Sequence, residues 1–488
     1  MPTISYPAHG NKQSFSFTPF SATPDVAPRT LSASRSGRAT KRATAQNVAT
    51  PIVFDPLAFV TALRRTENMR LRIPTTDPTE LAIVHSAPPT TRAANARPVY
   101  GGGMTIMTPS IIVEGARTAD MKAAQSAGAK IVHEGLDGKT LLAVDSIDHV
   151  ARICELLSKR EVGSVTPNFL RRFGHTPRST TEPAWAHAKI KLSAAWKISK
   201  GATDIRVAVL DEGVDTSHAS LKKAVVAERD FIGDNGHSAM PDGNDAHGTA
   251  CAGIILARGT KAPGIAPKCS LIAARIAMDD GSGSWVFDDY ATADAIDWCW
   301  RNDAAVLSNS WGGGAPSDAI SRAFGRARTQ GRGGKGAVVC IAAGNDQIPI
   351  DYPGQLTGYV TVGASNQKDE RKTRTSSDGE NWWGSNYGPT LWMLAPGVSI
   401  HTTDIAGPSG YEPGNFTATF NGTSSATPHV AGAAALMLSA NPNLSASAVR
   451  ELLSRTAKML KGQKGWTREL GYGRLDVGAA VAAAKKHP

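Results

Sequence analysis

From about residue 180 onward, short apolar runs alternate with longer segments in which apolar residues recur at helical spacing. The short runs are rich in Val, Ile, Leu and Ala, which is typical of strands buried on both faces of a parallel sheet. The pattern predicts strands over 205–210, 270–276, 304–309, 337–342 and 359–363, and helices over 247–257, 286–301, 316–330, 424–439 and 445–457. This alternation predicts an α/β protein with a mostly parallel, doubly wound sheet in residues 180–488.

Residues 104–173 show a different order of elements. Strand-like runs at 104–113, 129–133, 139–144 and 163–173 alternate with two helical segments, 118–127 and 147–159. Asp137-Gly138 is a hairpin turn signal between the second and third strands. The order β-α-β-β-α-β predicts a small α+β domain of the ferredoxin-like arrangement in residues 101–174.

Residues 1–100 show no comparable pattern. Residues 1–50 are polar and rich in Ser, Thr and Pro, which predicts a disordered basic arm, and residues 51–100 are predicted to be a linker with one helix near Pro56 to Glu67. Residues 1–50 hold no apolar core of the ~7–15 residues that a secretory signal needs. We therefore expect a cytoplasmic protein, with export by another route left open. No apolar run reaches the ~18 residues of a membrane span, so none is expected.

The net charge of +11 is concentrated near the N-terminus, where residues 1–100 carry 12 Lys and Arg against 5 Asp and Glu. The rest of the chain is therefore close to neutral, and the basic charge belongs to segments such as 34–42. A solvated tail accounts for this charge, and a nucleic-acid or membrane partner is the alternative. We expect no nucleic-acid partner.

Polar residues follow or precede the predicted elements at positions suited to chemistry. Asp211 follows the strand 205–210, and the carboxyl ends of parallel strands are where open α/β sheets place their sites. His247 opens a helix rich in small residues. Taken alone, Asp211 as a turn cap and His247 as a structural residue are the simpler interpretations.

Ser424 changes this interpretation. It follows Gly422-Thr423 at the start of a predicted helix, beside unpaired backbone N–H groups that favour the negative charge of an oxyanion. Asp211, His247 and Ser424 together can supply an orienting carboxylate, a general base and a nucleophile. Asn345, which follows the strand 337–342, can donate its side-chain N–H to the oxyanion.

These segments together resemble the subtilisin-like serine proteases, the subtilase or peptidase S8 family. The matching motifs occur in order and are Val209–Asp215, His247–Thr249, Ala342–Asn345 and Gly422–Gly432. The resemblance covers roughly residues 180–485. It implies a serine endopeptidase, a hydrolase that cuts protein or peptide substrates, with Asp211, His247 and Ser424 as its triad and Asn345 as its oxyanion donor.

The resemblance also implies substrate-binding segments. Ser308–Gly313 resembles the strand that lines the cleft, and Asp280–Gly283 resembles the edge strand on its other side. The residues implied in substrate binding are Gly281, Ser282, Gly283, Ser310, Trp311 and Gly312. Asp351, directly before Tyr352-Pro353, corresponds to the floor of the pocket for the side chain that precedes the cut. A carboxylate there predicts a preference for Arg or Lys, whereas a one-residue slip in this short loop would turn Asp351 outward.

Two departures from the family concern the triad and its cofactors. Glu212 stands where the family usually has a small hydroxyl residue. The segment 253–264 lacks the Asn-rich loop that binds a tight structural calcium in many members, and Ala257–Lys261 contains no carboxylate to supply the oxygen ligands that calcium requires. We assign no metal ligand, and a structural calcium elsewhere stays open.

The five cysteines form no CxxC pair and are too sparse for a disulfide scaffold, so most are expected to be buried free thiols. Cys251 lies one helical turn after His247 and resembles the thiol beneath the catalytic histidine in the proteinase K branch of the family. A simple core residue is the alternative.

The α+β domain stands directly ahead of the protease, as the propeptide of subtilisin-like zymogens does. The resemblance therefore implies an intramolecular inhibitor, removed by self-cleavage between Arg171 and Glu182; a permanent accessory domain is the alternative. For the whole chain, a non-catalytic relative that serves as a binding module is a second interpretation. An esterase of the α/β-hydrolase type would need a Gly-x-Ser-x-Gly elbow and the order Ser, Asp, His, which the chain lacks.

Overall fold

A seven-stranded sheet forms the centre of the C-terminal part of the computed structural model, which describes residues 3–8, 11–22, 79–85, 104–160, 162–174, 185–233, 238–279 and 284–488. The strand order is β16-β15-β14-β13-β8-β10-β9, and every pairing along it is parallel. In chain order the strands are β8 (Arg206–Asp211), β9 (Val225–Asp230), β10 (Ser270–Arg275), β13 (Ala304–Asn309), β14 (Val338–Ala342), β15 (Val360–Ser365) and β16 (Leu391–Pro396).

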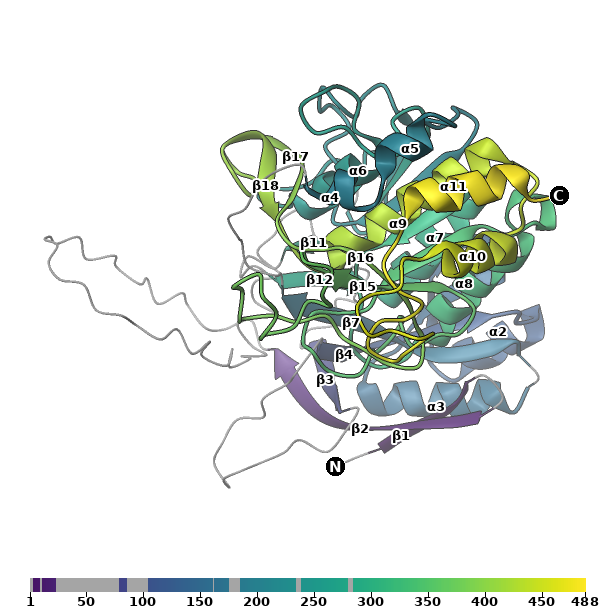
Figure 1. Cartoon of the computed structure of the whole chain (residues 1–488). Helices are drawn as coiled ribbons and strands as arrows, with labels where there is room; N and C mark the ends of the chain where they lie inside the picture. Colours follow the sequence, from purple (N-terminus) through teal and green to yellow (C-terminus); the bar gives the residue numbers. More distant parts are fainter. Residues whose placement is uncertain are drawn as a thin grey trace, which may run out of the picture.

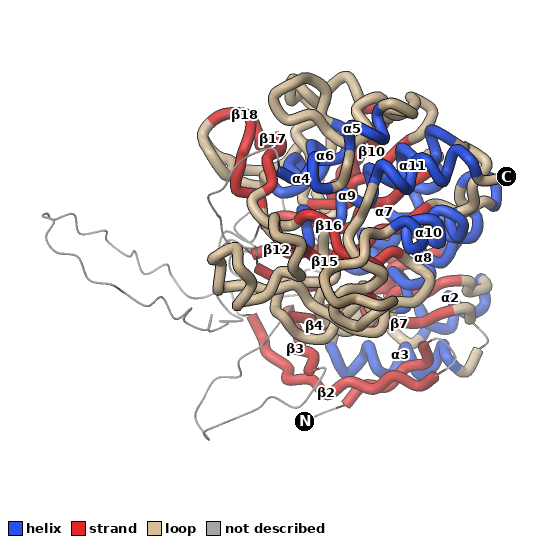
Figure 2. Tube along the Cα trace, in the orientation of Figure 1, coloured by secondary structure: helices blue, strands red, loops and turns tan. Residues whose placement is uncertain are grey.

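Helices cover both faces of this sheet (Figure 2). One face packs against α6 (His247–Leu256), α9 (Thr423–Ala440), α10 (Ala446–Thr456) and α11 (Val477–Lys486), and the other packs against α7 (Asp289–Arg301) and α8 (Asp318–Gln330). The short helices α4 (Trp185–Lys189) and α5 (Leu192–Trp196) and the hairpin β17 (Ile400–Gly407) and β18 (Gly414–Phe420) complete this part. The predicted α/β fold class with a parallel, doubly wound sheet is confirmed.

The α+β region below this sheet in Figure 1 has its elements in the order β-α-β-β-α-β. They are β4 (Met104–Glu114), α2 (Thr118–Ser126), β5 (Lys130–Glu134), β6 (Lys139–Ala143), α3 (Ile147–Ser158) and β7 (Ser164–Gly174), with a short 3₁₀ turn at Leu136–Gly138 before β6. Val150, Ile153 and Leu157 of α3 pack into a core with Ile111 and Phe169 of the strands. This core is separate from the two that flank the parallel sheet.

Strand β7 joins the two parts of the molecule. It pairs with β4 on one edge and, antiparallel, with β12 (Ser284–Asp288) on the other, so that Gly174 lies opposite Ser284. β12 in turn pairs with β11 (Ala277–Asp279). The sheet of the α+β region therefore continues directly into the strand that precedes α7.

Three strands near the N-terminus extend the same sheet beyond β4. They are β1 (Thr3–Ala8), β2 (Asn11–Ala22) and β3 (Thr79–His85), and each pairs antiparallel with the next. The prediction of a disordered arm is therefore wrong for residues 3–8 and 11–22. Polar and phenylalanine residues alternate over Ser14–Thr18, which is the period of a strand with one covered face. The helix predicted near Pro56 to Glu67 lies outside the described residues.

Charged side chains are buried where the α+β region meets the rest of the chain. Lys139 of β6 forms an ion pair with Asp297 of α7, and both side chains are fully buried. Arg326 of α8 donates to the same Asp297 carboxylate at 2.8 Å. Arg171 of β7 pairs with Asp289 and donates to Gly313 O at 3.0 Å. Because unpaired buried charges are costly, these pairs tie the two parts into one arrangement.

Within the described part of the chain, all five cysteines are free and buried, as the sequence predicts. None of the described helices combines the length and the apolar character needed to cross a membrane.

Candidate active site

Asp211 and His247 meet at the carboxyl end of β8. Asp211 is the last residue of β8 and is fully buried, and His247 is the first residue of α6. The Asp211 Oδ1 atom lies 2.9 Å from His247 Nδ1. A carboxylate can only accept, so Nδ1 carries the hydrogen and Nε2 is the basic nitrogen. Gly248 permits this approach, since a Cβ there would lie 2.0 Å from Gly213 O.

Two aromatic rings enclose the imidazole. Trp285 of β12 and Phe420 of β18 contact His247 edge to face, with ring centroids at 4.6 Å and 5.2 Å. His247 is consequently only 6% exposed. The motif search missed both aromatic residues because they come from segments far from His247 in sequence. Their packing restricts rotation of the ring and keeps its Nδ1 on Asp211.

Ser424 lies in the first turn of α9. Gly422, the residue before this helix, has φ 110°, a left-handed conformation that glycine tolerates best. The Ser424 hydroxyl donates to Ser310 O at 3.1 Å, and the Ser310 hydroxyl donates to Ser424 O at 3.0 Å. These reciprocal bonds fix the helix start against the segment that follows β13.

Cys251 lies between His247 and Ser424. Its Sγ is 3.7 Å from His247 Nδ1 and donates to Ser424 O at 3.6 Å. Burial raises the pKa of this thiol well above its usual range, and the Asp211 carboxylate raises it further. The raised pKa favours the protonated thiol, so Cys251 is not suited to act as the nucleophile of the reaction.

The side-chain amide of Asn345 is held in one orientation by Thr423. Asn345 Oδ1 accepts from the Thr423 N–H at 2.8 Å and from the Thr423 hydroxyl at 3.0 Å. Thr423 is the first residue of α9 and precedes Ser424. With its oxygen fixed on this side, the amide directs its Nδ2 donors the other way, as an oxyanion donor requires.

The predicted substrate-binding residues have different settings. Gly281, Ser282 and Gly283 lie outside the described residues. Ser310 contacts Ser424, whereas the Trp311 indole packs inward against Phe287 and Phe324, with centroids at 5.4 and 6.0 Å, and is only 2% exposed. Of Trp311, only the backbone is therefore positioned to meet a substrate.

Gly312 lies beside Tyr352, the residue that follows Asp351. A Cβ at Gly312 would lie 3.2 Å from Tyr352 O, and the Gly313 N–H donates to the same oxygen at 2.6 Å. Asp351 is half-buried, and burial together with the nearby Asp346 carboxylate raises its pKa to about 7. Loss of surrounding water likewise raises the pKa of Asp346. The motif search missed Asp346, although it directly follows Asn345.

The segment 257–264 offers few ligands for a calcium ion. Residues 257–264 contain no carboxylate, and Arg258 donates to Pro267 O at 3.0 Å. Over the described ranges, one group of side chains has the spacing of a metal site, namely Asp211, His247 and Cys251. The hydrogen bond between the first two already accounts for that grouping.

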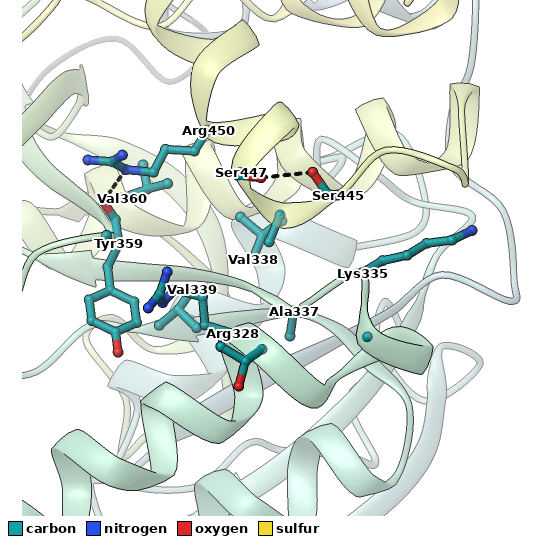
Figure 3. Close-up of a pocket in the computed structure, with 14 residues that line it drawn as sticks. Arg328, Lys335, Ala337, Val338, Val339, Tyr359, Val360, Ser445, Ser447 and Arg450 are labelled. Atoms are coloured by element: carbon teal, nitrogen blue, oxygen red, sulfur yellow. Dashed lines mark hydrogen bonds between the residues drawn. The ribbon is translucent and has the colours of Figure 1, made fainter. Parts of the chain in front are cut away.

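A separate pocket lies at the amino ends of β14 and β15, whereas Asp211 lies at the carboxyl end of β8 (Figure 3). It has a volume of about 330 Å³ and an apolar floor with Arg328 and Arg450 on its walls. Arg450 donates to Tyr359 O at 2.9 Å and stacks on Trp392, while Arg328 stacks on the Tyr359 ring. Both arginines are engaged by neighbouring aromatic residues, and the pocket contains none of the predicted site residues.

Residues 202–473 match the sequence profile of peptidase S8, described as the subtilase family. Subtilisin DY of Bacillus licheniformis is 38% identical over 289 residues, which is 58% of this chain and 92% of that protein. A calcium-dependent protease of Trichormus variabilis is 31% identical over 384 residues, which is 67% of this chain but 55% of that protein.

Among solved structures, fervidolysin of Fervidobacterium pennivorans, described as a keratinolytic enzyme related to subtilisin, is similar in fold. The TM-score is 0.61 at 24% identity, and the match covers 78% of this chain and 61% of fervidolysin. At this identity the likeness concerns the fold alone.

Proposed function

This chain belongs to the subtilase family, and from that premise we propose that Asp211, His247 and Ser424 are its catalytic triad and that residues 101–174 inhibit it until self-cleavage. The chain is a serine endopeptidase that acts on protein or peptide substrates. The observation that carries the triad assignment is the 2.9 Å hydrogen bond between Asp211 and His247, with Cys251 in contact with both His247 and Ser424.

The chemistry follows from the orientation of each group. The Ser424 hydroxyl gives up its hydrogen bond to Ser310 O. His247 Nε2 then takes the Ser424 proton as Oγ bonds to the substrate carbonyl carbon. Asn345 Nδ2 and backbone N–H groups at the start of α9 stabilise the oxyanion. His247 then gives its proton to the leaving amine as the C–N bond breaks. Water hydrolyses the acyl-enzyme by the same steps, and Asp211 stabilises the imidazolium in both halves.

The inhibitor role of residues 101–174 is supported by the pairing of β7 with β12. β12 begins at Ser284, directly after the predicted edge segment Gly281–Gly283. The chain therefore leaves β7 at Gly174, opposite Ser284, which directly follows in sequence the segment that the family uses to hold substrate. The buried pairs Lys139–Asp297 and Arg171–Asp289 hold this strand and its domain in place.

A preference for Arg or Lys before the cut is supported by two neighbouring carboxyl groups. The Asp346 carboxylate adds to the effect of burial in raising the pKa of Asp351, and Tyr352, which follows Asp351, contacts the cleft segment through its backbone oxygen. A cationic side chain bound between them would offset the cost of burying their negative charge.

The triad is tested by peptide hydrolysis with three single variants, Ser424→Ala, His247→Ala and Asp211→Asn. We expect each to lose several orders of magnitude in kcat/KM while keeping the fold, and the Ser424/His247 double variant to be scarcely worse than either single, because these residues act as one unit. Near-normal rates in Ser424→Ala would instead favour a different nucleophile. An inactive wild-type protein would favour the binding-module interpretation.

A further inference from the structure

The backbone at the start of α6 has a hydrogen-bond partner outside the helix. Its N-cap residue, Ala246, has no side chain that can accept a hydrogen bond, and the first N–H groups of a helix lack partners within the helix. Glu212, from the strand end beside it, places Oε1 at 2.6 Å from the His247 N–H. Glu212 is only 1% exposed. A residue remote in sequence thus caps the helix at the residue that bears the catalytic imidazole.

Asp211 and Glu212 hold His247 from two directions. Asp211 Oδ1 accepts from the imidazole Nδ1 at 2.9 Å and from the Glu212 N–H at 3.0 Å. We infer that Glu212 is a positioning residue, whose carboxyl group fixes the backbone of His247 while Asp211 fixes its ring. The inference rests on the proposed triad. A small hydroxyl residue in this position would end two bonds short of the Glu212 carboxyl oxygen, so the contact requires a side chain with the length of glutamate and an accepting oxygen at its end.

The surroundings of Glu212 determine its charge. Burial raises the pKa of Glu212 well above its usual range, and the Asp245 and Asp211 carboxylates raise it further. The titratable groups that face it include Asp211, Asp245, Asp279, His247, Cys251 and Tyr411. A neutral acid can still accept from the His247 N–H through its carbonyl oxygen. It also leaves Asp211 as the charge that stabilises the imidazolium.

The test compares three substitutions that separate hydrogen bonding from charge. Glu212→Gln keeps an accepting oxygen and should retain kcat to within about threefold, whereas Glu212→Leu and Glu212→Thr lose the contact and should lower kcat by roughly ten- to a hundredfold with little change in KM. Ser424→Ala and wild type bracket the assay, and thermal unfolding identifies any variant that fails to fold. If Leu does not fold, the Thr variant carries the test.

The acid limb of the pH profile of kcat/KM tests the charge of Glu212. Because the raised pKa of Glu212 favours its neutral form, Glu212→Gln should leave the midpoint of this limb in place. A lower midpoint in Glu212→Gln would mean that a negative charge had been removed, and would overturn the neutral form. Wild-type kcat in folded Glu212→Leu or Glu212→Thr would overturn the positioning role while leaving the triad assignment intact.

Discussion

Cys251 illustrates how a residue can touch a catalytic base without sharing its chemistry. Its protonated thiol lies 3.7 Å from His247 Nδ1. A mercurial bound to Sγ would occupy the space of the imidazole and should abolish peptide hydrolysis. Cys251→Val should stay active and resist the reagent, whereas Cys299→Val, which removes another buried thiol, should remain sensitive. Equal inhibition of wild type and Cys251→Val would assign the effect to a different cysteine.

At Asp351, the raised pKa gives the proposed specificity a pH dependence. The group is neutral below its pKa of about 7 and becomes a carboxylate as the pH rises through that value. The ratio of kcat/KM for peptides with Arg before the cut to those with Leu should therefore increase between about pH 6 and pH 8. The ratio cancels any effect of pH on the catalytic steps that the two substrates share.

Asp351→Gly supplies the control for this pocket. The variant should lose the preference for Arg by about tenfold or more, and its ratio should no longer change with pH. A wild-type preference for Leu or Phe, or an unchanged ratio in Asp351→Gly, would show that Asp351 faces away from the bound side chain.

The sequence motifs predicted the polar residues of the candidate site, but not the aromatic residues that enclose His247. Asp211, His247 and Asn345 each stand next to a buried strand or at a helix start, so local pattern identifies them. Trp285 and Phe420 contact His247 only because β12 and β18 are placed there by the tertiary fold. No spacing along the chain encodes that contact.

Among the elements, the strands β13, β14 and β9 show how burial affects what can be predicted. β13 and β14 are buried along their whole length and read as unbroken apolar runs, and their observed bounds agree with prediction to within a residue. The edge strand β9 has the sequence Val-Val-Ala-Glu-Arg-Asp and is only partly buried, so it gives no such run and was missed. Edge strands meet solvent, which removes the periodic signal on which prediction depends.

The contact between β6 and α7 makes an element-scale prediction about the α+β region. Lys139→Met would leave Asp297 buried with Arg326 as its cationic partner and the Trp300 indole as a further hydrogen-bond donor. In a Ser424→Ala background, we expect amides of β7 to exchange hydrogen roughly tenfold faster, because the docked state loses part of a buried ion pair. Lys159→Met is the matched control, since its pair with Glu155 is exposed and should contribute little. Equal exchange in both variants would remove the ion pair from the docking interaction.

At the scale of the whole molecule, one antiparallel sheet runs from the N-terminal strands through β4 and β7 into β12. Sequence patterns predicted the β4–β7 region and the parallel sheet separately, because each has its own periodicity and its own core. They gave no sign that β12 and β11, from the C-terminal part of the chain, join the sheet of the β4–β7 region. Such pairing depends on backbone hydrogen bonds between segments more than a hundred residues apart, which side-chain periodicity does not report.

This shared sheet limits the positions at which the proposed self-cleavage between Arg171 and Glu182 can occur. Arg171 is buried and paired with Asp289, and the backbone remains in β7 as far as Gly174. The peptide bonds between Arg171 and Gly174 would have to leave the sheet before they could enter the cleft. Between Gly174 and Glu182 the sequence contains a single Arg or Lys, which is Arg178. A basic preference at Asp351 therefore selects the bond between Arg178 and Ser179.

Self-cleavage between Arg178 and Ser179 can be tested by following the maturation of the purified protein and its variants. The purified active enzyme should begin at Ser179 by N-terminal sequencing, and Ser424→Ala should remain full length because the cut requires the nucleophile. Arg178→Ala should slow processing by about tenfold or more, since the replacement cannot pair with Asp351, whereas Arg172→Ala should mature at the wild-type rate. Normal processing of pure Ser424→Ala would rule out self-cleavage. A mature N-terminus elsewhere, with Arg178→Ala processed normally, would separate maturation from the Asp351 pocket.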